Sequence, residues 1–352
     1  MRRALITGVT GQDGAYLARL LLDKGYKVYG TFRRTSSPTF WRLQSLGIQE
    51  RVHLIAADLA DAGSLTQAIR ISEPDEVYHL AAMSFVGTSF DQPVFTGDIT
   101  GLGVTRLLDT IRLVNPNTKF YQASSSEMFG DGSTDLRDER SDFSPASPYA
   151  AAKLYGFWIT RVYRDAFKIF AANGILFNHE SPLRSLEFVT RKITNAVAMI
   201  TLGVAKEVRL GNLNAMRDWG YAPEYVQAMW DIMQLETPDD FVIATGEAHS
   251  VREFADEAFS IAGLDWKKYV KIDKKLFRPL DVPSLRGDFS KAKRVFRWEP
   301  RTTFSELVKI MVEADLNRWK DALSGKVFPW DVSFSTNLDQ PSNSDYTFNG
   351  LQ

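Results

Sequence analysis

Short runs of apolar, often β-branched residues alternate with longer amphipathic stretches through the first half of the chain. This alternation is typical of βαβ units and predicts a parallel sheet. We expect strands over residues 4–8, 27–33, 52–58, 76–82, 119–125 and 174–178. Helices are expected between them, over residues 15–24, 64–71, 100–114 and 147–167. The predicted fold class is therefore α/β, with a Rossmann-type doubly wound parallel sheet.

The alternation of short apolar runs and amphipathic stretches becomes less regular after residue 178. Amphipathic stretches over residues 188–202, 223–235, 251–262 and 304–320 predict helices, separated by short strands and Pro-rich loops. We expect a smaller α/β lobe over the carboxyl edge of the sheet, where doubly wound folds bind ligands. The predicted division is a Rossmann domain over residues 1–178 with segments returning from the later chain, a ligand-binding lobe mainly over residues 179–330, and a flexible tail over residues 331–352.

Composition narrows the class of protein. The 352 residues are 44% hydrophobic and 24% charged, which is ordinary for a globular chain with a sizeable core. A formal net charge of -1 argues against a nucleic-acid-binding protein. No stretch approaches the ~20 apolar residues that span a bilayer, so no membrane association is expected.

The counts of cysteine and histidine exclude some chemistry. The chain has no cysteine, which excludes disulfides and thiol catalysis and suits a reducing cytoplasm. Its four histidines are His53, His79, His179 and His249, and none has the spacing of a zinc site. We therefore expect a soluble cytoplasmic protein without a catalytic metal.

A glycine-rich turn follows the first predicted strand and opens the first helix. It consists of Gly8, Val9, Thr10, Gly11, Gln12, Asp13 and Gly14. Glycines let the backbone approach a pyrophosphate, and the helix N-terminus offers free N–H groups and a positive dipole end. A turn of this kind alone can be a plain loop, but in its strand–turn–helix context it predicts a dinucleotide.

The end of the second strand indicates which dinucleotide binds. An NAD site usually has an acidic residue there, whereas an NADP site has arginine. This chain has Arg33, Arg34 and Ser36, and no carboxylate. Two guanidinium groups and a hydroxyl suit a 2′-phosphate, so NADP is favoured. The alternative is that both arginines are solvated or contact another subunit.

The ends of the third and fourth strands supply further candidate cofactor contacts. Asp58 and Leu59 close the third strand, where a carboxylate can accept the adenine amino group. The fourth strand ends in small residues that allow close backbone contact, and the candidates there are Leu80, Ala81, Ala82 and Ser84. Ordinary packing at the strand ends is the alternative for both segments.

Four groups able to move or steer protons lie within about thirty residues: Ser125, Glu127, Tyr149 and Lys153. Tyr149 and Lys153 are four apart in a helical pattern and share one face. A nearby ammonium and an oxidised nicotinamide both stabilise a phenolate and so bring its pKa toward neutrality. Tyr-x-x-x-Lys is common by chance, but behind a glycine turn it points to redox chemistry with an additional acid/base step.

Several longer motifs carry a family resemblance. They are Gly-Val-Thr-Gly-Gln-Asp-Gly-Ala-Tyr-Leu, Gln-Ala-Ser-Ser-Ser-Glu-Met-Phe-Gly, Ser-Pro-Tyr-Ala-Ala-Ala-Lys, Leu-Phe-Asn-His-Glu-Ser-Pro, Phe-Val-Thr-Arg-Lys-Ile and Arg-Asp-Trp-Gly. With them the chain resembles the extended short-chain dehydrogenase/reductase superfamily, and within it most closely the GDP-mannose 4,6-dehydratase family, up to about residue 320.

The resemblance implies a lyase with an internal redox cycle. Tyr149, aided by Ser125 and Lys153, would oxidise the C4 hydroxyl of a GDP-sugar with NADP. Glu127 would then remove the C5 proton and assist loss of the C6 hydroxyl as water, before the hydride returns to C6. The resemblance also implies a homodimer or homotetramer in which the Arg33–Arg42 loop reaches a neighbouring subunit.

The resemblance assigns further residues to ligands. His179 and Arg184 match positions near the nicotinamide and its phosphates. The positions that match substrate contacts, together with Ser84, Ser125 and Glu127, are Asn178, Lys192, Arg217, Arg278 and Asp281.

Four positions depart from the family pattern. Ser125 replaces threonine, Asp281 replaces glutamate, and Tyr221 replaces histidine. Ser185 stands where glycine is usual, so a left-handed backbone there would be strained by ~1 kcal/mol. The substrate could therefore be a related GDP-heptose.

Two competing functions use the same fold. A nucleotide-sugar reductase or epimerase needs the tyrosine and the lysine but does not need Glu127. A non-catalytic dinucleotide sensor would not need all four of Ser125, Glu127, Tyr149 and Lys153, so their joint presence argues against it.

Overall fold

Seven parallel strands form the central sheet of the computed structural model, which describes residues 1–36, 39–131 and 136–326. In spatial order they are β12 (Asp240–Ile243), β7 (Ala171–Leu176), β5 (Lys119–Ser125), β4 (Glu76–His79), β1 (Arg3–Thr7), β2 (Lys27–Phe32) and β3 (His53–Ala56). From β1 the chain adds β2 and β3 on one side, and from β4 it adds β5, β7 and β12 on the other side. The predicted doubly wound α/β sheet is therefore confirmed. The expected tail, residues 331–352, lies outside the described residues.

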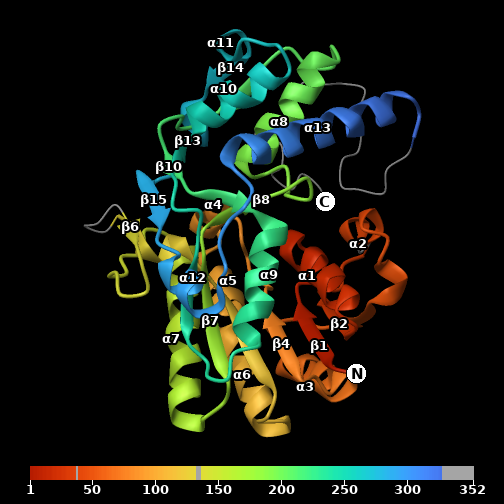
Figure 1. The fold of residues 1–352 in the computed structure, drawn as a ribbon, viewed down its shortest axis with the longest axis vertical. Coiled ribbons are helices and arrows are strands. Elements are labelled where there is room, and N and C mark those ends of the chain that lie inside the picture. Colours follow the sequence, from red (N-terminus) through yellow and green to blue (C-terminus); the bar gives the residue numbers. More distant parts are fainter. Residues whose placement is uncertain (37–38, 132–135, 327–352) are drawn as a thin grey trace.

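Helices cover both faces of this sheet (Figure 1). Side chains alternate along β1, so Ala4 and Ile6 pack into one core while Leu5 packs into another. The first face carries α1 (Gln12–Asp23) and α9 (Ala222–Met233). The second face carries α3 (Ala62–Ser72), α6 (Gly103–Val114) and α7 (Pro148–Phe167). The sheet is thus buried on both sides, as parallel sheets are.

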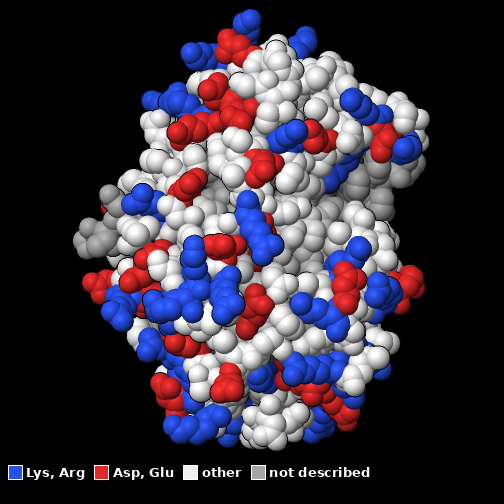
Figure 2. All heavy atoms as spheres, viewed as in Figure 1, with Lys and Arg blue, Asp and Glu red and all other residues white. Residues whose placement is uncertain are grey.

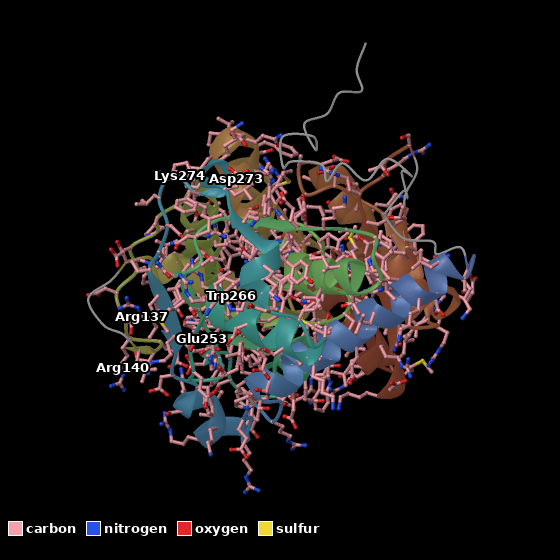
Figure 3. The ribbon with its side chains drawn as sticks, turned by 90° about the horizontal axis from the view of Figure 1, so that it is seen from above. Arg137, Arg140, Glu253, Trp266, Asp273 and Lys274 are labelled. Atoms are coloured by element: carbon pink, nitrogen blue, oxygen red, sulfur yellow. The ribbon has the colours of Figure 1, made fainter. Side chains whose placement is uncertain are left out.

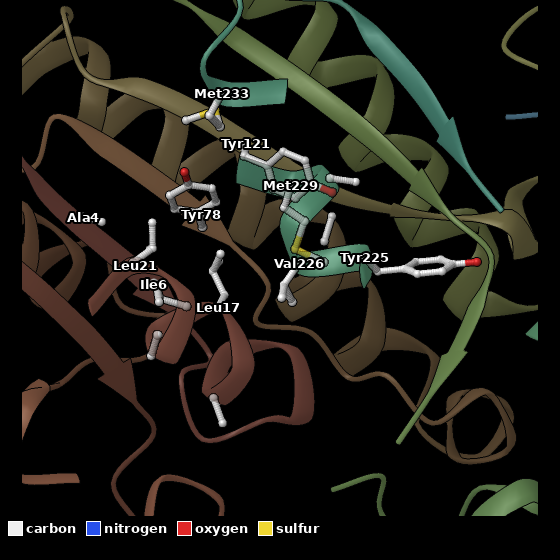
Figure 4. Packing of buried hydrophobic residues seen from close by; sticks show 14 of the residues in the cluster. Ala4, Ile6, Leu17, Leu21, Tyr78, Tyr121, Tyr225, Val226, Met229 and Met233 are labelled. Carbon is white, nitrogen blue, oxygen red and sulfur yellow. The ribbon is translucent and has the colours of Figure 1, made fainter. Parts of the chain in front are cut away.

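The core under α1 and α9 shows how late residues complete the early fold (Figure 4). Met229 and Met233 of α9 pack with Tyr78 and Tyr121 from the central strands. The sequence pattern correctly predicts a helix near residues 223–235, but not that it lies on the sheet. The edge strand β12, which pairs with β7, was not predicted.

A helical layer lies above the carboxyl ends of the strands in Figure 1. It contains α8 (Val189–Thr201), α10 (Val251–Ile261), α11 (Trp266–Tyr269) and α13 (Phe304–Leu323), with the parallel pair β9 (Val208–Leu210) and β14 (Val270–Ile272). Seen from above, Glu253 and Trp266 lie near the middle of this layer, while Arg137 and Arg140 lie toward one edge (Figure 3).

One buried ion pair joins two of these helices. Asp315 of α13 is fully buried and accepts from Arg191 and Thr194 of α8 at 2.9 and 2.7 Å. Arg191 also donates to the carbonyls of Pro182 and Arg184, which precede α8. The contact between α8 and α13 therefore also fixes the loop that leads into α8.

Shorter elements link the main strands and helices. They are α2 (Trp41–Ser45), α4 (Val86–Asp91), α5 (Pro93–Thr96), β6 (Leu136–Arg137), β8 (Asn178–Glu180), β10 (Met216–Arg217), β11 (Trp219–Tyr221), β13 (His249–Ser250), β15 (Ser284–Gly287) and α12 (Ser290–Phe296), together with single turns at Gln49–Arg51, Gly97–Leu102, Ser126–Phe129 and Lys274–Leu276. Among the described residues, none of the helices is long and apolar enough to cross a bilayer. Charges of both signs mix over the face in Figure 2.

Candidate active site

The backbone of the glycine turn packs so closely that Gly8 and Gly14 have no space for a Cβ atom. Gly8 has φ +71°, and a Cβ atom there would lie 2.9 Å from the Ala81 Cα atom. A Cβ atom on Gly14 would lie 2.4 Å from the Gly8 carbonyl oxygen. Gly11 caps α1 without a side-chain hydrogen bond, so the first-turn N–H groups face outward unshielded by a side chain. The turn is therefore a cradle that fits a pyrophosphate.

A threonine hydroxyl fixes the neighbouring strand end against this turn. Thr7 Oγ1 accepts from the backbone N–H groups of Leu80 and Ala81 at 3.1 and 3.2 Å. Its own proton therefore goes to His79 Nδ1, 2.7 Å away. Burial lowers the pKa of His79 to about 3, so this acceptor stays neutral. Sequence reasoning missed both Thr7 and His79, because neither belongs to a motif of its own.

The other predicted cofactor residues lie at the same edge of the sheet. Arg33, Arg34 and Ser36 are exposed just beyond β2. Beyond the adjacent β3, the Asp58 carboxylate accepts from the backbone of Ala60 at 2.9 Å. Leu59 is buried, Ala82 is partly buried and Ser84 is exposed. The carboxyl ends of β1 to β4 thus bring these residues to one edge.

Ser125 is the last residue of β5, Glu127 lies in the turn that follows it, and Tyr149 lies in the first turn of α7. Burial raises the pKa of the Tyr149 phenol to about 12, although a hydrogen bond to Ser125 and the charge of Arg184 oppose this rise. The charge of Glu127 raises it further. All three groups therefore act on the phenol. The expected lowering of its pKa involves an oxidised nicotinamide and stays a prediction.

Lys153 lies one turn further along α7 and is also buried. Its Nζ donates to the Ala123 carbonyl at 2.8 Å and lies 5.8 Å from the centroid of the Tyr149 ring. Burial lowers the pKa of Lys153 to about 8, and the Asp13 charge opposes that change. The ammonium is held by β5 beneath the phenol.

Glu127 also belongs to a charged cluster at the base of the upper layer. Its carboxylate lies 3.6 Å from an Nη1 atom of Arg278, which in turn lies 4.0 Å from Asp281. Arg217 Nη2 and Asn212 Nδ2 donate to the two oxygens of Asp281, both at 3.1 Å. Three predicted substrate residues and the predicted base are thereby brought together. Asn212 was not predicted, and it carries no signal in the sequence.

Two further predicted substrate residues lie on β8 and α8. Asn178 opens β8, and its buried Oδ1 atom has no hydrogen-bond partner among the described residues. An unsatisfied buried acceptor is costly, so this atom is available to a ligand donor. Lys192 lies on α8, where burial lowers its pKa and the Asp273 carboxylate opposes that change.

Asp13 and His179 bind each other. His179 Nε2 lies 2.8 Å from Asp13 Oδ2, and Nδ1 lies 2.7 Å from the Phe177 carbonyl. Burial opposes the charge on both groups, but their attraction outweighs it: it raises the pKa of His179 and lowers that of Asp13 to about 2. Both residues thus tie the glycine turn to β8. Gln12 strengthens the tie, since it donates to the His179 carbonyl at 3.1 Å.

The expected backbone strain at Ser185 is absent. Among the described residues, the positive-φ positions other than glycine are Glu73, Lys168 and Arg297. The Ser185 hydroxyl instead accepts from Arg42 Nη2 at 2.9 Å. Arg42, at the end of the loop expected to reach a neighbouring subunit, thus binds its own chain. Tyr221 ends β11 and is partly buried.

The glycine turn and the Ser–Tyr–Lys group meet at the carboxyl edge of a doubly wound sheet, which defines an extended short-chain dehydrogenase/reductase. The family profile described as GDP-mannose 4,6 dehydratase matches residues 5–311. The chain therefore belongs to the GDP-mannose 4,6-dehydratase family, whose members are hydro-lyases.

Individual relatives agree with this assignment. The chain is 50% identical over 323 residues to GDP-mannose 4,6 dehydratase 2 of Arabidopsis thaliana, covering 89% of this chain and 86% of that protein. It is 47% identical over 339 residues to the Homo sapiens GDP-mannose 4,6 dehydratase, covering 89% and 91%. The solved structure of a dTDP-glucose 4,6-dehydratase from Bacillus anthracis, in complex with NAD, shares the fold, with a TM-score of 0.80 at 18% identity over 91% of this chain and 98% of that one.

Proposed function

We propose that this chain converts GDP-mannose to GDP-4-dehydro-6-deoxy-mannose and water. The observation that carries this proposal is the position of Glu127. Its carboxylate shares one buried site with Ser125 and Tyr149, and it lies beside the guanidinium of Arg278. A simple sugar dehydrogenase needs the tyrosine and the lysine, but it has no use for a second proton acceptor there.

NADP is the proposed cofactor. Its pyrophosphate would lie on the turn from Gly8 to Gly14, and its 2′-phosphate would lie beside Arg33, Arg34 and Ser36. The tight glycine cradle and the two exposed guanidinium groups beyond β2 support this placement. Bound nicotinamide would supply hydride transfer, from C4 of the sugar and back to C6.

The protein supplies the proton transfers. Tyr149, hydrogen-bonded to Ser125, takes the proton of the C4 hydroxyl as the ketone forms there. Because a C4 ketone acidifies the C5–H bond, Glu127 can take that proton and pass it to the C6 hydroxyl, which leaves as water. A proton equivalent to the one taken at O4 returns to C5. The sum is the loss of one water.

Tyr149 needs positive charge before it can act as a base. Burial holds its pKa at about 12 in the protein alone, so the phenol is neutral at pH 7. Arg184 already opposes this rise, and the Lys153 ammonium lies one helical turn away. Binding of the oxidised, positively charged cofactor would complete the lowering that base catalysis requires.

The nucleotide would be held by the cluster of Arg217, Arg278 and Asp281, with Lys192 and Asn178 beside it. A diphosphate competes with carboxylates for a guanidinium. Substrate would therefore draw Arg278 away from Glu127, 3.6 Å distant, and free the base when the sugar is in place.

The protein mixed with NADP⁺ and GDP-mannose tests the proposal. We expect a product lighter by one water in the mass spectrum, with no lasting absorbance of reduced nicotinamide. Lasting reduction would indicate a dehydrogenase or reductase instead, and an isomer of unchanged mass would indicate an epimerase. GDP-heptoses run beside GDP-mannose identify the preferred sugar.

Replacing Glu127 by glutamine tests the assigned base. Glu127→Gln should lower kcat at least about 10²-fold, because the amide cannot accept the C5 proton. NADP⁺ and GDP should bind as before in calorimetry. The control is Glu50→Gln, which changes an exposed glutamate in the turn before β3. Full product formation by Glu127→Gln would contradict the role given to this carboxylate.

Replacing both arginines beyond β2 tests the choice of cofactor. Arg33→Ala with Arg34→Ala should weaken NADP⁺ at least about tenfold while leaving NAD⁺ within about threefold, because only NADP carries the 2′-phosphate. Arg70→Ala, an exposed arginine on α3, is the control. An equal loss for NAD⁺ and NADP⁺ would remove the 2′-phosphate assignment.

A further inference from the structure

Arg42, in the short helix α2, holds two separate parts of the site. Its Nη1 atom donates to the Thr10 carbonyl of the glycine turn at 3.1 Å. Its Nε atom donates to the Leu183 carbonyl at 2.8 Å, and Nη2 donates to the Ser185 hydroxyl at 2.9 Å. One planar guanidinium thus spans the cofactor turn and the 181–188 loop between β8 and α8. It lies 4.2 Å over the ring of Trp41, which is buried.

The two contacts in the loop lie on either side of Arg184. Leu183 and Ser185 are its neighbours in the chain, and its own carbonyl accepts from Arg191 at 2.7 Å. The Leu183 carbonyl, the Arg184 carbonyl and the Ser185 side chain are therefore all held. Arg184 lies 3.2 Å from the Glu180 carboxylate and 3.5 Å over the Phe188 ring, and its charge acts on both Asp13 and Tyr149. Arg42 fixes the segment that presents this charge.

Other ties join the same two segments from within α1. Asp13 binds His179, and the Ser181 hydroxyl donates to Gln12 at 2.8 Å. These contacts fix the start of the loop, whereas Arg42 fixes its middle from a third element. Without Arg42, residues 183–185 would keep their contacts to the upper layer through Arg191 but would lose the contacts from Arg42 that join them to the glycine turn.

We propose that Arg42 is a positioning residue that couples the cofactor turn to the 181–188 loop, which joins the proposed nucleotide-binding residues Asn178 and Lys192, so that each ligand binds more tightly when the other is present. The inference rests on the proposed function, because it takes NADP and a GDP-sugar as the two ligands. A ligand that orders either segment also orders the other through the shared guanidinium, and the second ligand then meets a smaller entropic cost. Thermodynamic linkage makes the effect reciprocal.

Ser185 gives Arg42 one of the acceptors found among the described residues. The family resemblance leads us to expect glycine there, and glycine has no hydroxyl to accept from Nη2. The serine thus adds a hydrogen bond to those that Arg42 makes with the Thr10 and Leu183 carbonyls. We therefore expect the coupling to depend on the hydroxyl at residue 185 as well as on Arg42.

Calorimetry with two ligands that do not react measures the coupling directly. The dissociation constant of NADP⁺ is determined with and without saturating GDP. In the wild type we expect GDP to tighten NADP⁺ binding about fivefold or more. In Arg42→Gln this factor should fall to about one, and in Ser185→Ala to an intermediate value, whereas Ser185→Thr, which keeps a hydroxyl, should retain it.

Arg70→Gln is the control, because Arg70 is an exposed arginine on α3, a helix separate from α2 and from residues 181–188. Its coupling factor should equal that of the wild type. If Arg42→Gln fails to fold, Ser185→Ala decides by itself, because a partly exposed hydroxyl can be removed without leaving a buried charge.

The outcomes of this experiment separate the inference from the proposed reaction. Wild-type protein that binds NADP⁺ and GDP independently, or Arg42→Gln and Ser185→Ala proteins with undiminished coupling, would overturn the role of Arg42, even if GDP-mannose is dehydrated. Coupling that is lost in Arg42→Gln and reduced in Ser185→Ala supports the role of Arg42. It does so even if the same wild-type protein leaves GDP-mannose unchanged, and that result would refute only the reaction.

Discussion

Asp13 and His179 show how a single pair of side chains can hold two segments 166 positions apart. His179 is buried and Asp13 is partly buried, so desolvation disfavours the charge on each of them. The raised pKa of His179 and the lowered pKa of Asp13 indicate that the pair is ionised at mildly acidic pH. Removing one member leaves the other as an uncompensated buried group, which is destabilising.

The pair predicts how stability depends on pH. The contribution of Asp13 is present above its ordinary pKa of 3.8 and is lost as the pH falls toward about 2. The contribution of His179 is complete below its ordinary pKa of 6.5 and is lost as the pH rises through its raised value. Asp13→Asn should therefore cost about 2–3 kcal/mol near pH 5.5, and less at pH 8.5.

Urea unfolding of wild-type and Asp13→Asn proteins at both pH values measures this difference. The control is Asp23→Asn, which removes an exposed carboxylate paired with Arg19 at the other end of α1. A cost that is the same at pH 5.5 and pH 8.5 would contradict an ionised pair.

The strand–turn–helix from β1 to α1 is the element on which the cofactor site depends. Its backbone doubles back so closely that Gly8 touches the end of β4 and Gly14 touches Gly8. Gly8 has a positive φ, and Gly14 has no space for a Cβ atom, so the two glycines are required for different reasons.

Gly14→Ala tests the second reason. A methyl group at 2.4 Å from the Gly8 carbonyl oxygen forces the turn open, and we expect a loss of about 3 kcal/mol together with much weaker NADP⁺ binding. Gly97→Ala is the matched control: it lies at a helical position with no atoms nearby, so stability should change by less than about 1 kcal/mol. Equal stability and cofactor binding for both variants would show that the turn can accommodate a Cβ atom at residue 14.

At the scale of the whole molecule, the outer face of α7 carries large apolar side chains beside the charged Arg161 and Asp165. Trp158 and Val162 are 48% and 50% exposed, and Tyr155 and Phe167 on the same helix are similar. Patches of this kind on soluble chains mark contacts with other proteins. We propose that a second copy of this chain covers them, in the homodimer or homotetramer that the family resemblance implies.

Val162→Glu should reduce the mass of the assembly in light scattering, because a glutamate buried in the contact between two copies would lack a polar partner. Ile272→Glu is the control, since Ile272 is 59% exposed on β14 in the upper layer. A wild-type protein that is monomeric, or a Val162→Glu variant with unchanged mass, would exclude α7 as the interface.

Much of this architecture follows from the sequence, because apolar runs and glycine turns have local causes. The strand that ends at Ser125 and the helix that carries Tyr149 were both predicted, and parallel strands must bring their carboxyl ends to one edge. In contrast, β12 is a four-residue run beginning with Asp240, too short to distinguish from a loop. The amphipathic pattern of α9 indicates a buried face but not which partner covers it.

The features that sequence reasoning missed depend on tertiary contacts. Arg42 donates partly to backbone carbonyls, which have no sequence signature. From the sequence alone, Arg42 therefore resembles an exposed arginine. The high pKa of Tyr149 has the same cause: the Tyr-x-x-x-Lys spacing indicates a nearby charge, whereas burial, which dominates, is set by the whole site.

The return of the chain to the sheet after α8 limits how this family can exchange parts. α9 and β12 complete the sheet layer before the chain returns to the upper layer at α10, so segments of the two layers alternate along the sequence. A chimera that combines the upper layer of one relative with the sheet layer of another therefore needs several crossovers. A single junction near residue 178 would take Met229 and its neighbours from one parent and Tyr78 and Tyr121 from the other. The two halves of this core would then not match, and such recombinants should be insoluble.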